Sequence, residues 1–233
     1  MMKTIVMLTL SVLLCKTALA QQLPSLFLVG DSISILYTPS LRADLAHTFN
    51  FSRKATSQDQ TPQQQLNDPN ANGQDSRLVL KYLQTRYAEP GFHPDVVVVN
   101  CGLWDIKRSP KTNAIVVDAA EYKANLTAIA DLIRAHGAKM VWINTTPVDD
   151  ARHNSVQKSF FRFNADVVAY NQIASDLFKA RGVPEIDLYW FTAQLGPGHV
   201  VDHVHFDEPT SAKQAAFIAG FLESWWTRAA PER

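Results

Sequence analysis

The chain has 233 residues, of which 22 are lysine or arginine and 22 are aspartate or glutamate, so its formal net charge is zero at neutral pH. It contains no basic block interleaved with aromatic residues, which excludes nucleic acid as an expected partner. The length suits one domain with a sizeable hydrophobic core, and we expect this domain to span residues 21–233.

The first element in chain order is an expected signal peptide at residues 1–20. Lys3 precedes an apolar run over residues 5–14, and small residues that end at Ala20 follow this run. The pattern predicts cleavage after Ala20 and a protein that is secreted or periplasmic. No later stretch approaches the roughly 20 apolar residues of a membrane-spanning helix, so we expect no stable membrane insertion. Cleavage would leave Cys101 as the only cysteine, so no internal disulfide is expected.

Short apolar runs rich in β-branched residues predict strands that are buried on both faces. Four such runs occur, at residues 26–29, 95–100, 139–144 and 184–189. Amphipathic segments predict helices that alternate with these strands, at residues 75–87, 117–136, 163–180 and 210–226. The alternation indicates an α/β fold with a parallel sheet covered on both sides. Two polar, turn-rich segments predict long surface loops over the ligand-binding edge of the sheet, at residues 58–73 and 149–159.

A serine follows the first predicted strand, in the sequence Gly30-Asp31-Ser32-Ile33. A glycine at this place permits a sharp turn, which would present the Ser32 hydroxyl to a substrate and the Ser32 N–H to an oxyanion. The same residues also form ordinary turns and helix N-caps. The motif alone therefore does not identify a nucleophile.

An aspartate lies three residues before a histidine near the other end of the chain, as Asp202 and His205. One turn can hold this carboxylate against the imidazole, so that the other ring nitrogen faces a serine as general base. His203 is a competing candidate. Adjacent side chains tend to point apart, however, which favours His205.

The order serine, aspartate, histidine, with the serine after the first strand and the pair before the last helix, resembles the SGNH (GDSL-like) hydrolases. The resemblance covers essentially all of residues 21–233. It implies a three-layer α/β/α sandwich with a central, mostly parallel, five-stranded sheet. It also implies a serine esterase without metal or cofactor that works through an acyl-enzyme, with Ser32 as nucleophile, His205 as general base and Asp202 as its partner.

The family's second sequence block supplies a glycine whose backbone N–H joins that of the nucleophile in the oxyanion hole. Gly73, in an Asn-Gly pair before a predicted helix, is the best match. Asn-Gly is also a common turn dipeptide. The resemblance further implies supporting roles for Asp31 in the nucleophile turn, and for Gly102 and Asp105 in the loop after the third block's strand.

The family's third block normally reads Gly-x-Asn-Asp, and its asparagine provides another oxyanion donor. Residues 102–105 read Gly-Leu-Trp-Asp, so Trp104 stands where the family has asparagine. Trp104 keeps one N–H donor, and it could either contribute to the oxyanion hole or form an apolar wall of the acyl pocket. Asn100 or Asn144 could replace the missing amide.

Two alternatives from other classes remain open. The segment His199–Asp207 contains three histidines and two aspartates, which could hold a divalent ion in a metal-dependent hydrolase. The change at position 104 could instead mark a non-catalytic carbohydrate-binding protein that keeps the fold. Its sugar-stacking faces would be those of Trp104, Trp142 and Trp190.

The expected partner is a small-molecule or polysaccharide ester. Exported hydrolases of the family commonly act on acetylated polysaccharides, lipids or small esters. This favours a short acyl group, such as acetyl, on a carbohydrate or another polar alcohol. Arg152 and Arg162 could meet a uronate, but solvated arginines are the more frequent case.

Overall fold

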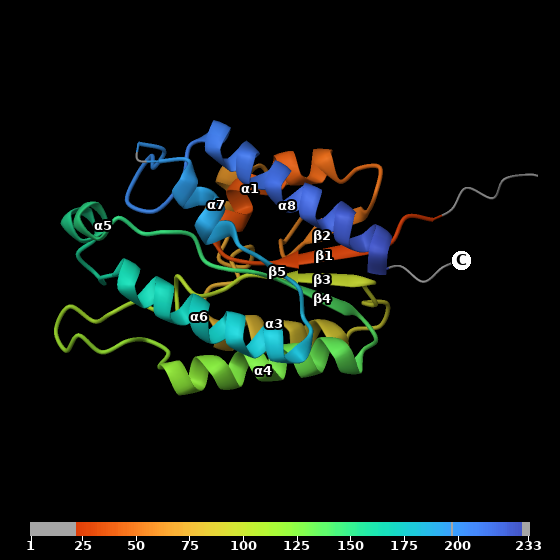
Figure 1. The fold of residues 1–233 in the computed structure, drawn as a ribbon, viewed down its shortest axis with the longest axis horizontal. Coiled ribbons are helices and arrows are strands. Elements are labelled where there is room, and N and C mark those ends of the chain that lie inside the picture. Colours follow the sequence, from red (N-terminus) through yellow and green to blue (C-terminus); the bar gives the residue numbers. More distant parts are fainter. Residues whose placement is uncertain (1–21, 197, 230–233) are drawn as a thin grey trace, which may run out of the picture.

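The computed structural model describes residues 22–196 and 198–229, and the expected signal peptide at residues 1–20 lies outside them. The chain forms three layers, in which a sheet is covered by helices on both faces (Figure 1). The strands are β1 (Ser25–Val29), β2 (Asn50–Arg53), β3 (Val96–Val99), β4 (Lys139–Ile143) and β5 (Glu185–Ile186). The predicted α/β sandwich with a five-stranded sheet is confirmed, and the sheet is parallel throughout.

Helices α1 (Ser32–Asp44), α7 (Leu188–Gln194) and α8 (Glu208–Ala229) lie on one face of the sheet (Figure 1). Helices α3 (Ser76–Ala88), α4 (Ala119–Ala135) and α6 (Asn164–Arg181) lie on the other. Two short helices, α2 (Pro62–Asn67) and α5 (Asp150–Val156), lie in connections after β2 and β4. Within the described residues, no helix is both long and apolar enough to cross a membrane.

The strand order, β2-β1-β3-β4-β5, determines where a ligand can bind. The chain moves outward from β1 to β2 and then returns to the other side of β1 for β3. The winding direction therefore reverses between β1 and β3, and open α/β sheets bind ligands outside the carboxyl ends of the strands at such a point. Ser32 follows β1 at this edge, and residues 100–105 follow β3.

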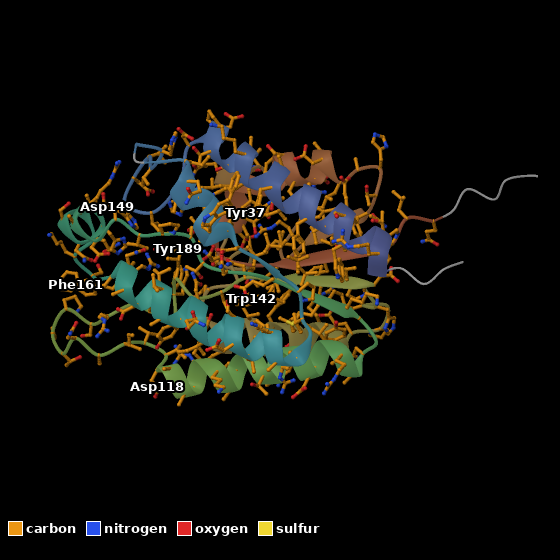
Figure 2. The ribbon with its side chains drawn as sticks, in the orientation of Figure 1. Tyr37, Asp118, Trp142, Asp149, Phe161 and Tyr189 are labelled. Atoms are coloured by element: carbon orange, nitrogen blue, oxygen red, sulfur yellow. The ribbon has the colours of Figure 1, made fainter. Side chains whose placement is uncertain are left out.

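The hydrophobic core surrounds the central strands and holds this edge in place. All four residues of β3 are buried. Trp142 of β4, labelled in Figure 2, is fully buried, and its ring packs on Phe178 of α6 with the ring centroids 4.9 Å apart. Interiors packed in this way are stiff, so the strand ends form a rigid base for the loops above them.

The structure adds β2 and α1, which the sequence did not predict, and it differs from the predicted elements in three further places. The run at residues 184–189 forms only a two-residue strand, because the Asp187 side chain accepts a hydrogen bond from the Trp190 N–H and begins helix α7. The predicted loops at residues 58–73 and 149–159 contain α2 and α5. Their N-caps, Thr61 and Asp149, satisfy backbone N–H groups that would otherwise be unpaired.

Gly102, directly beyond β3, has a backbone conformation that only glycine adopts without strain, with φ of +147°. A Cβ atom there would also collide with Oγ1 of Thr145. We therefore expect Gly102→Ala to lower the free energy of unfolding by about 3 kcal/mol, from backbone strain and overpacking together. Urea unfolding followed by circular dichroism measures this.

Gly91 provides a matched control for this substitution. Its φ of +88° is also positive, but nothing lies within 4 Å of the position that a Cβ would occupy. Gly91→Ala should therefore cost only about 1–2 kcal/mol, the strain component alone. Equal losses in the two variants would show that the collision with Thr145 is relieved at no cost.

Candidate active site

The turn between β1 and α1 places Ser32 at the first position of a 13-residue helix. The Asp31 side chain caps this helix by accepting a hydrogen bond from the Ile33 N–H at 2.9 Å. A Cβ on Gly30 would come within 2.8 Å of Ser34 Oγ, so only glycine fits before the cap. The chain must therefore turn sharply here, and Ser32 remains half-buried at the sheet edge.

Ser32 and the segment around Asp202 meet in space. The Nε2 atom of His205 lies 2.8 Å from Ser32 Oγ, and its Nδ1 atom lies 2.6 Å from Oδ2 of Asp202. If Nδ1–H donates to the carboxylate, Nε2 is left to accept the hydroxyl proton of Ser32. The three side chains thus form one continuous hydrogen-bonded chain.

Asp202 is held in its ionised form. Burial alone would raise its pKa, but hydrogen bonds from the His205 N–H, the His205 ring and the Val204 N–H outweigh burial and lower the pKa well below its usual range. The two backbone bonds are each 2.8 Å long. The carboxylate can therefore stabilise a positive charge on the imidazole of His205 over the whole physiological pH range.

His203, the competing histidine, points away from Ser32. Its Nδ1 atom lies 3.0 Å from Nδ1 of His153 in helix α5. His153 is fully buried, and its Nδ1 also lies 3.3 Å from the carbonyl oxygen of His203. This contact attaches the loop that carries His205 to α5.

The buried His153 makes stability depend on pH. Burial, aided by the charge of Arg162, lowers the pKa of His153 to about 4, against roughly 6.5 in an unfolded chain. Between these values the unfolded state binds the proton and the folded state does not, so stability falls as pH falls. We expect this group to remove about 3 kcal/mol of unfolding free energy between pH 6.5 and pH 4.

Urea unfolding of the wild type and of His153→Phe across this pH range measures the effect. The variant should lose less stability on acidification, because its ring does not titrate. The exposed His47 gives a control, since His47→Phe should retain the pH dependence of the wild type. Parallel curves for wild type and His153→Phe would contradict the assignment.

The proposed metal site at His199–Asp207 does not assemble. His199 Nε2 lies 2.8 Å from the Leu195 carbonyl oxygen, and Asp207 caps α8 by accepting from the Thr210 N–H. Across the described residues, no three His, Cys, Asp or Glu side chains gather closely enough to hold a metal ion.

The three tryptophans of the carbohydrate-binding alternative do not form a common platform. Trp142 is fully buried, whereas Trp190 is 54% exposed on α7. The ring of Trp104 is covered by the Lys107 ammonium group, which lies 3.0 Å from the ring centroid. No single sugar can therefore stack on all three.

The two expected backbone donors of the oxyanion hole differ in their hydrogen bonding. The N–H of Ser32 makes no hydrogen bond to any other described residue, and it lies at the positive end of helix α1. The N–H of Gly73, in contrast, donates to the carbonyl oxygen of Gly30 at 2.8 Å. The prediction that Gly73 supplies a free donor is therefore not supported, because its N–H holds the second block against the nucleophile turn.

The other amides do not replace the family's asparagine. The Asn100 side chain donates to the Ile143 carbonyl oxygen at 3.0 Å, and that of Asn144 donates to Asp187 at 2.8 Å. The indole N–H of Trp104 donates to no described residue, so its part in the oxyanion hole stays a prediction. Asp105 is buried and accepts from the Ser76 N–H at 2.9 Å, and burial raises its pKa to about 7.

The structure places Arg162 in the interior. Only 3% of its surface is exposed, so it is not the solvated arginine expected. Its Nε donates to the carbonyl oxygen of Leu103, next to Trp104, at 2.5 Å. Flanking phenylalanines at positions 160, 161 and 163 were the available signal, since an arginine in an apolar run is often drawn into the interior. Figure 2 shows the neighbouring Phe161 at the end of the molecule where α5 lies.

Comparisons with known proteins identify the family of this chain. Residues 28–211 match the model of the GDSL-like Lipase/Acylhydrolase family. None of the curated proteins matches the chain. Among solved structures, the lipase/acylhydrolase from Enterococcus faecalis is similar with a TM-score of 0.63 and 19% identity, over 87% of this chain and 97% of that one.

Two further solved structures share the fold. A putative acylhydrolase from Bacteroides fragilis has a TM-score of 0.62 and 16% identity, over 89% of this chain and 90% of its own. A psychrotrophic esterase from Pseudoalteromonas, also solved in a form inhibited by monoethylphosphonate, has a TM-score of 0.60 and 13% identity, over 87% and 98%. Because the family model spans most of the chain, this protein belongs to the GDSL-like Lipase/Acylhydrolase family of ester hydrolases.

Proposed function

We propose that this protein is a secreted serine esterase that removes short acyl groups, such as acetyl, from a carbohydrate or another polar alcohol. The observation that carries the proposal is the hydrogen-bonded chain from Ser32 through His205 to Asp202. Nucleophile, base and orienting carboxylate are each within hydrogen-bond reach of the next group, which is the requirement for acyl transfer through a serine.

The reaction proceeds in two steps. Ser32 Oγ bonds to the ester carbonyl carbon while its proton passes to Nε2 of His205, and the carbonyl oxygen takes the negative charge. The Ser32 N–H, at the start of α1, stabilises that oxyanion. Collapse of this intermediate breaks the bond to the alcohol, which leaves with the proton from His205.

An acyl group then remains on Ser32. Water attacks this acyl-enzyme and gives its proton to His205, which returns it to Ser32 Oγ as the carboxylic acid departs. Asp202 stabilises the imidazolium in both steps and gains no proton itself.

The surroundings of the site favour a polar substrate. His203, Lys107 and Arg162 are polar or charged, and both aromatic rings beside them, Trp104 and Phe160, are covered by cations. Such surroundings suit a short acyl group and a hydrophilic alcohol better than a long alkyl chain, which needs apolar walls. Export rests on the sequence of residues 1–20.

A panel of esters tests the reaction and the substrate together. Purified protein of residues 21–233 is assayed on acetyl, butanoyl and octanoyl nitrophenyl esters and on acetylated sugars, before and after treatment with a phosphonate. We expect the acetyl compounds to give the highest kcat/KM, and we expect the phosphonate to abolish turnover and to label Ser32, as peptide mass spectrometry would detect. A preference for octanoyl esters would contradict the substrate class, and turnover that resists phosphonate but fails with a chelator would contradict the serine mechanism.

A further inference from the structure

Two cationic side chains meet at one aromatic ring beside the candidate active site. The Lys107 ammonium nitrogen lies 4.2 Å from the ring centroid of Phe160, and the guanidinium carbon of Arg162 lies 4.8 Å from the same centroid. Trp104 flanks Lys107 on another side. These contacts bring the loop after β3 together with the segment that precedes α6.

Neither cation has a carboxylate partner. Within the part of the chain that the structure describes, no Asp or Glu oxygen lies within 4.0 Å of the charged nitrogens of Lys107 or Arg162. The acid that attracts Lys107 most is Asp75, but Asp75 pairs with Arg77 at 2.8 Å. The acid that attracts Arg162 is Asp31, whose carboxylate already caps α1.

No nearby carboxylate offsets the removal of these two cations from water, so the pKa of each group is lowered. Burial, reinforced by the charge of Arg162, lowers the pKa of Lys107 to about 7. Burial also lowers the pKa of Arg162 to about 10. Arg162 is buried and Lys107 is half-buried. Charges removed from water in proteins are normally paired, so two such neighbouring cations without a partner indicate a place where an anion from outside the chain binds.

The Lys107–Arg162 pair lies next to both halves of the candidate site. Arg162 Nε donates to the carbonyl oxygen of Leu103, which lines the same small cavity as Asp31 of the nucleophile turn. The Phe160 ring that both cations contact lies 5.6 Å from the ring of His153, and that ring lies 4.8 Å from the ring of His203, two residues before His205. The pair is therefore connected through packed side chains both to the nucleophile turn and to the loop that carries His205.

We infer that Lys107 and Arg162 form a carboxylate-binding subsite, so that the preferred ester carries an anionic group, as a uronic acid does, close to the bond that is cleaved. The inference rests on the proposed esterase function. A charge-assisted hydrogen bond to a carboxylate in partly buried surroundings changes affinity by about 10- to 100-fold.

Two substrates that differ only in charge test the subsite. Acetylated glucuronate and acetylated glucuronamide have nearly the same shape, and acetate release is measured for both. We expect wild-type kcat/KM to be at least about tenfold higher for the glucuronate. Lys107→Met should remove this preference through a rise in KM for the glucuronate alone, and Lys107→Arg should restore most of it.

Lys158 gives a matched control, because it is an exposed lysine near the same segment whose ammonium group donates only to the Asn154 carbonyl oxygen. Lys158→Met removes the same charge and should keep the preference. Equal kcat/KM for the two substrates in the wild type would overturn the subsite, and so would a preference that Lys107→Met leaves unchanged.

A binding measurement separates the subsite from the esterase function. Calorimetry with free glucuronate and free glucuronamide requires no turnover, and we expect only the glucuronate to bind, in a manner that Lys107→Met abolishes. If neutral acetyl esters are cleaved but glucuronate does not bind, the subsite fails and the esterase stands. If glucuronate binds but no ester is cleaved, the esterase fails and the anion site stands.

Discussion

Replacing Ser32 with alanine is expected to lower kcat for ester hydrolysis by about 10⁴-fold or more. The loss follows because the attacking oxygen is removed, and no other described hydroxyl is hydrogen-bonded to His205. The fold should survive, since among the described residues the Ser32 side chain is hydrogen-bonded only to His205 and alanine suits the first turn of a helix. Turnover of a nitrophenyl acetate and a thermal unfolding curve measure both effects.

Ser40 supplies the control, because it lies in the same helix and its side chain makes no hydrogen bond within the described residues. Ser40→Ala should retain turnover within a few-fold. If Ser32→Ala kept substantial activity while remaining folded, Ser32 would not be the nucleophile and the proposed mechanism would be lost.

Asp202→Asn is expected to lower kcat by about 10⁴-fold at neutral pH while leaving KM within a few-fold. The carboxylate oxygen that lies 2.6 Å from His205 Nδ1 would be replaced by an amide. An amide nitrogen at that place favours the wrong tautomer of His205, in which Nε2 carries the proton and cannot accept one from Ser32. The amide also cannot stabilise an imidazolium charge.

Asp207 offers a comparison from the same loop. It caps helix α8, so Asp207→Asn should affect stability by about 1 kcal/mol or less and turnover hardly at all. Kinetics of both variants on the same ester, with circular dichroism spectra, separate the two roles. Equal turnover in Asp202→Asn and wild type would mean that His205 needs no carboxylate partner.

The sequence predicted the centre of the fold better than its edges. Four consecutive valines at residues 96–99 can only be a buried strand, and the structure places them in the middle of the sheet. Strand β2, at the sheet edge, has only four residues and an exposed Asn50 at its start. Helix α1 contains Pro39, a residue that is unfavourable inside a helix. Neither carries a local pattern strong enough to separate it from a loop.

In the candidate site, too, local features could be predicted more easily than contacts between distant residues. The spacing between Asp202 and His205 is a local property, so one turn could be predicted to join them. The cap by Asp31 is local too. The Gly73 N–H donates to the Gly30 carbonyl oxygen, and Arg162 donates to the Leu103 carbonyl oxygen. In each of these pairs the two residues are far apart in the chain. The contact between Ser32 and His205, which are also distant in the chain, could be predicted only through the resemblance to a known family.

The distance along the chain between the two reacting groups has a consequence for biosynthesis. Ser32 and His205 are 173 positions apart, and helix α1, which begins at Ser32, packs against helix α8, which follows His205. A nascent chain therefore cannot assemble the proton-transfer pair until nearly all of it has left the ribosome. The cell's own esters are thus protected from this protein until its synthesis is almost complete.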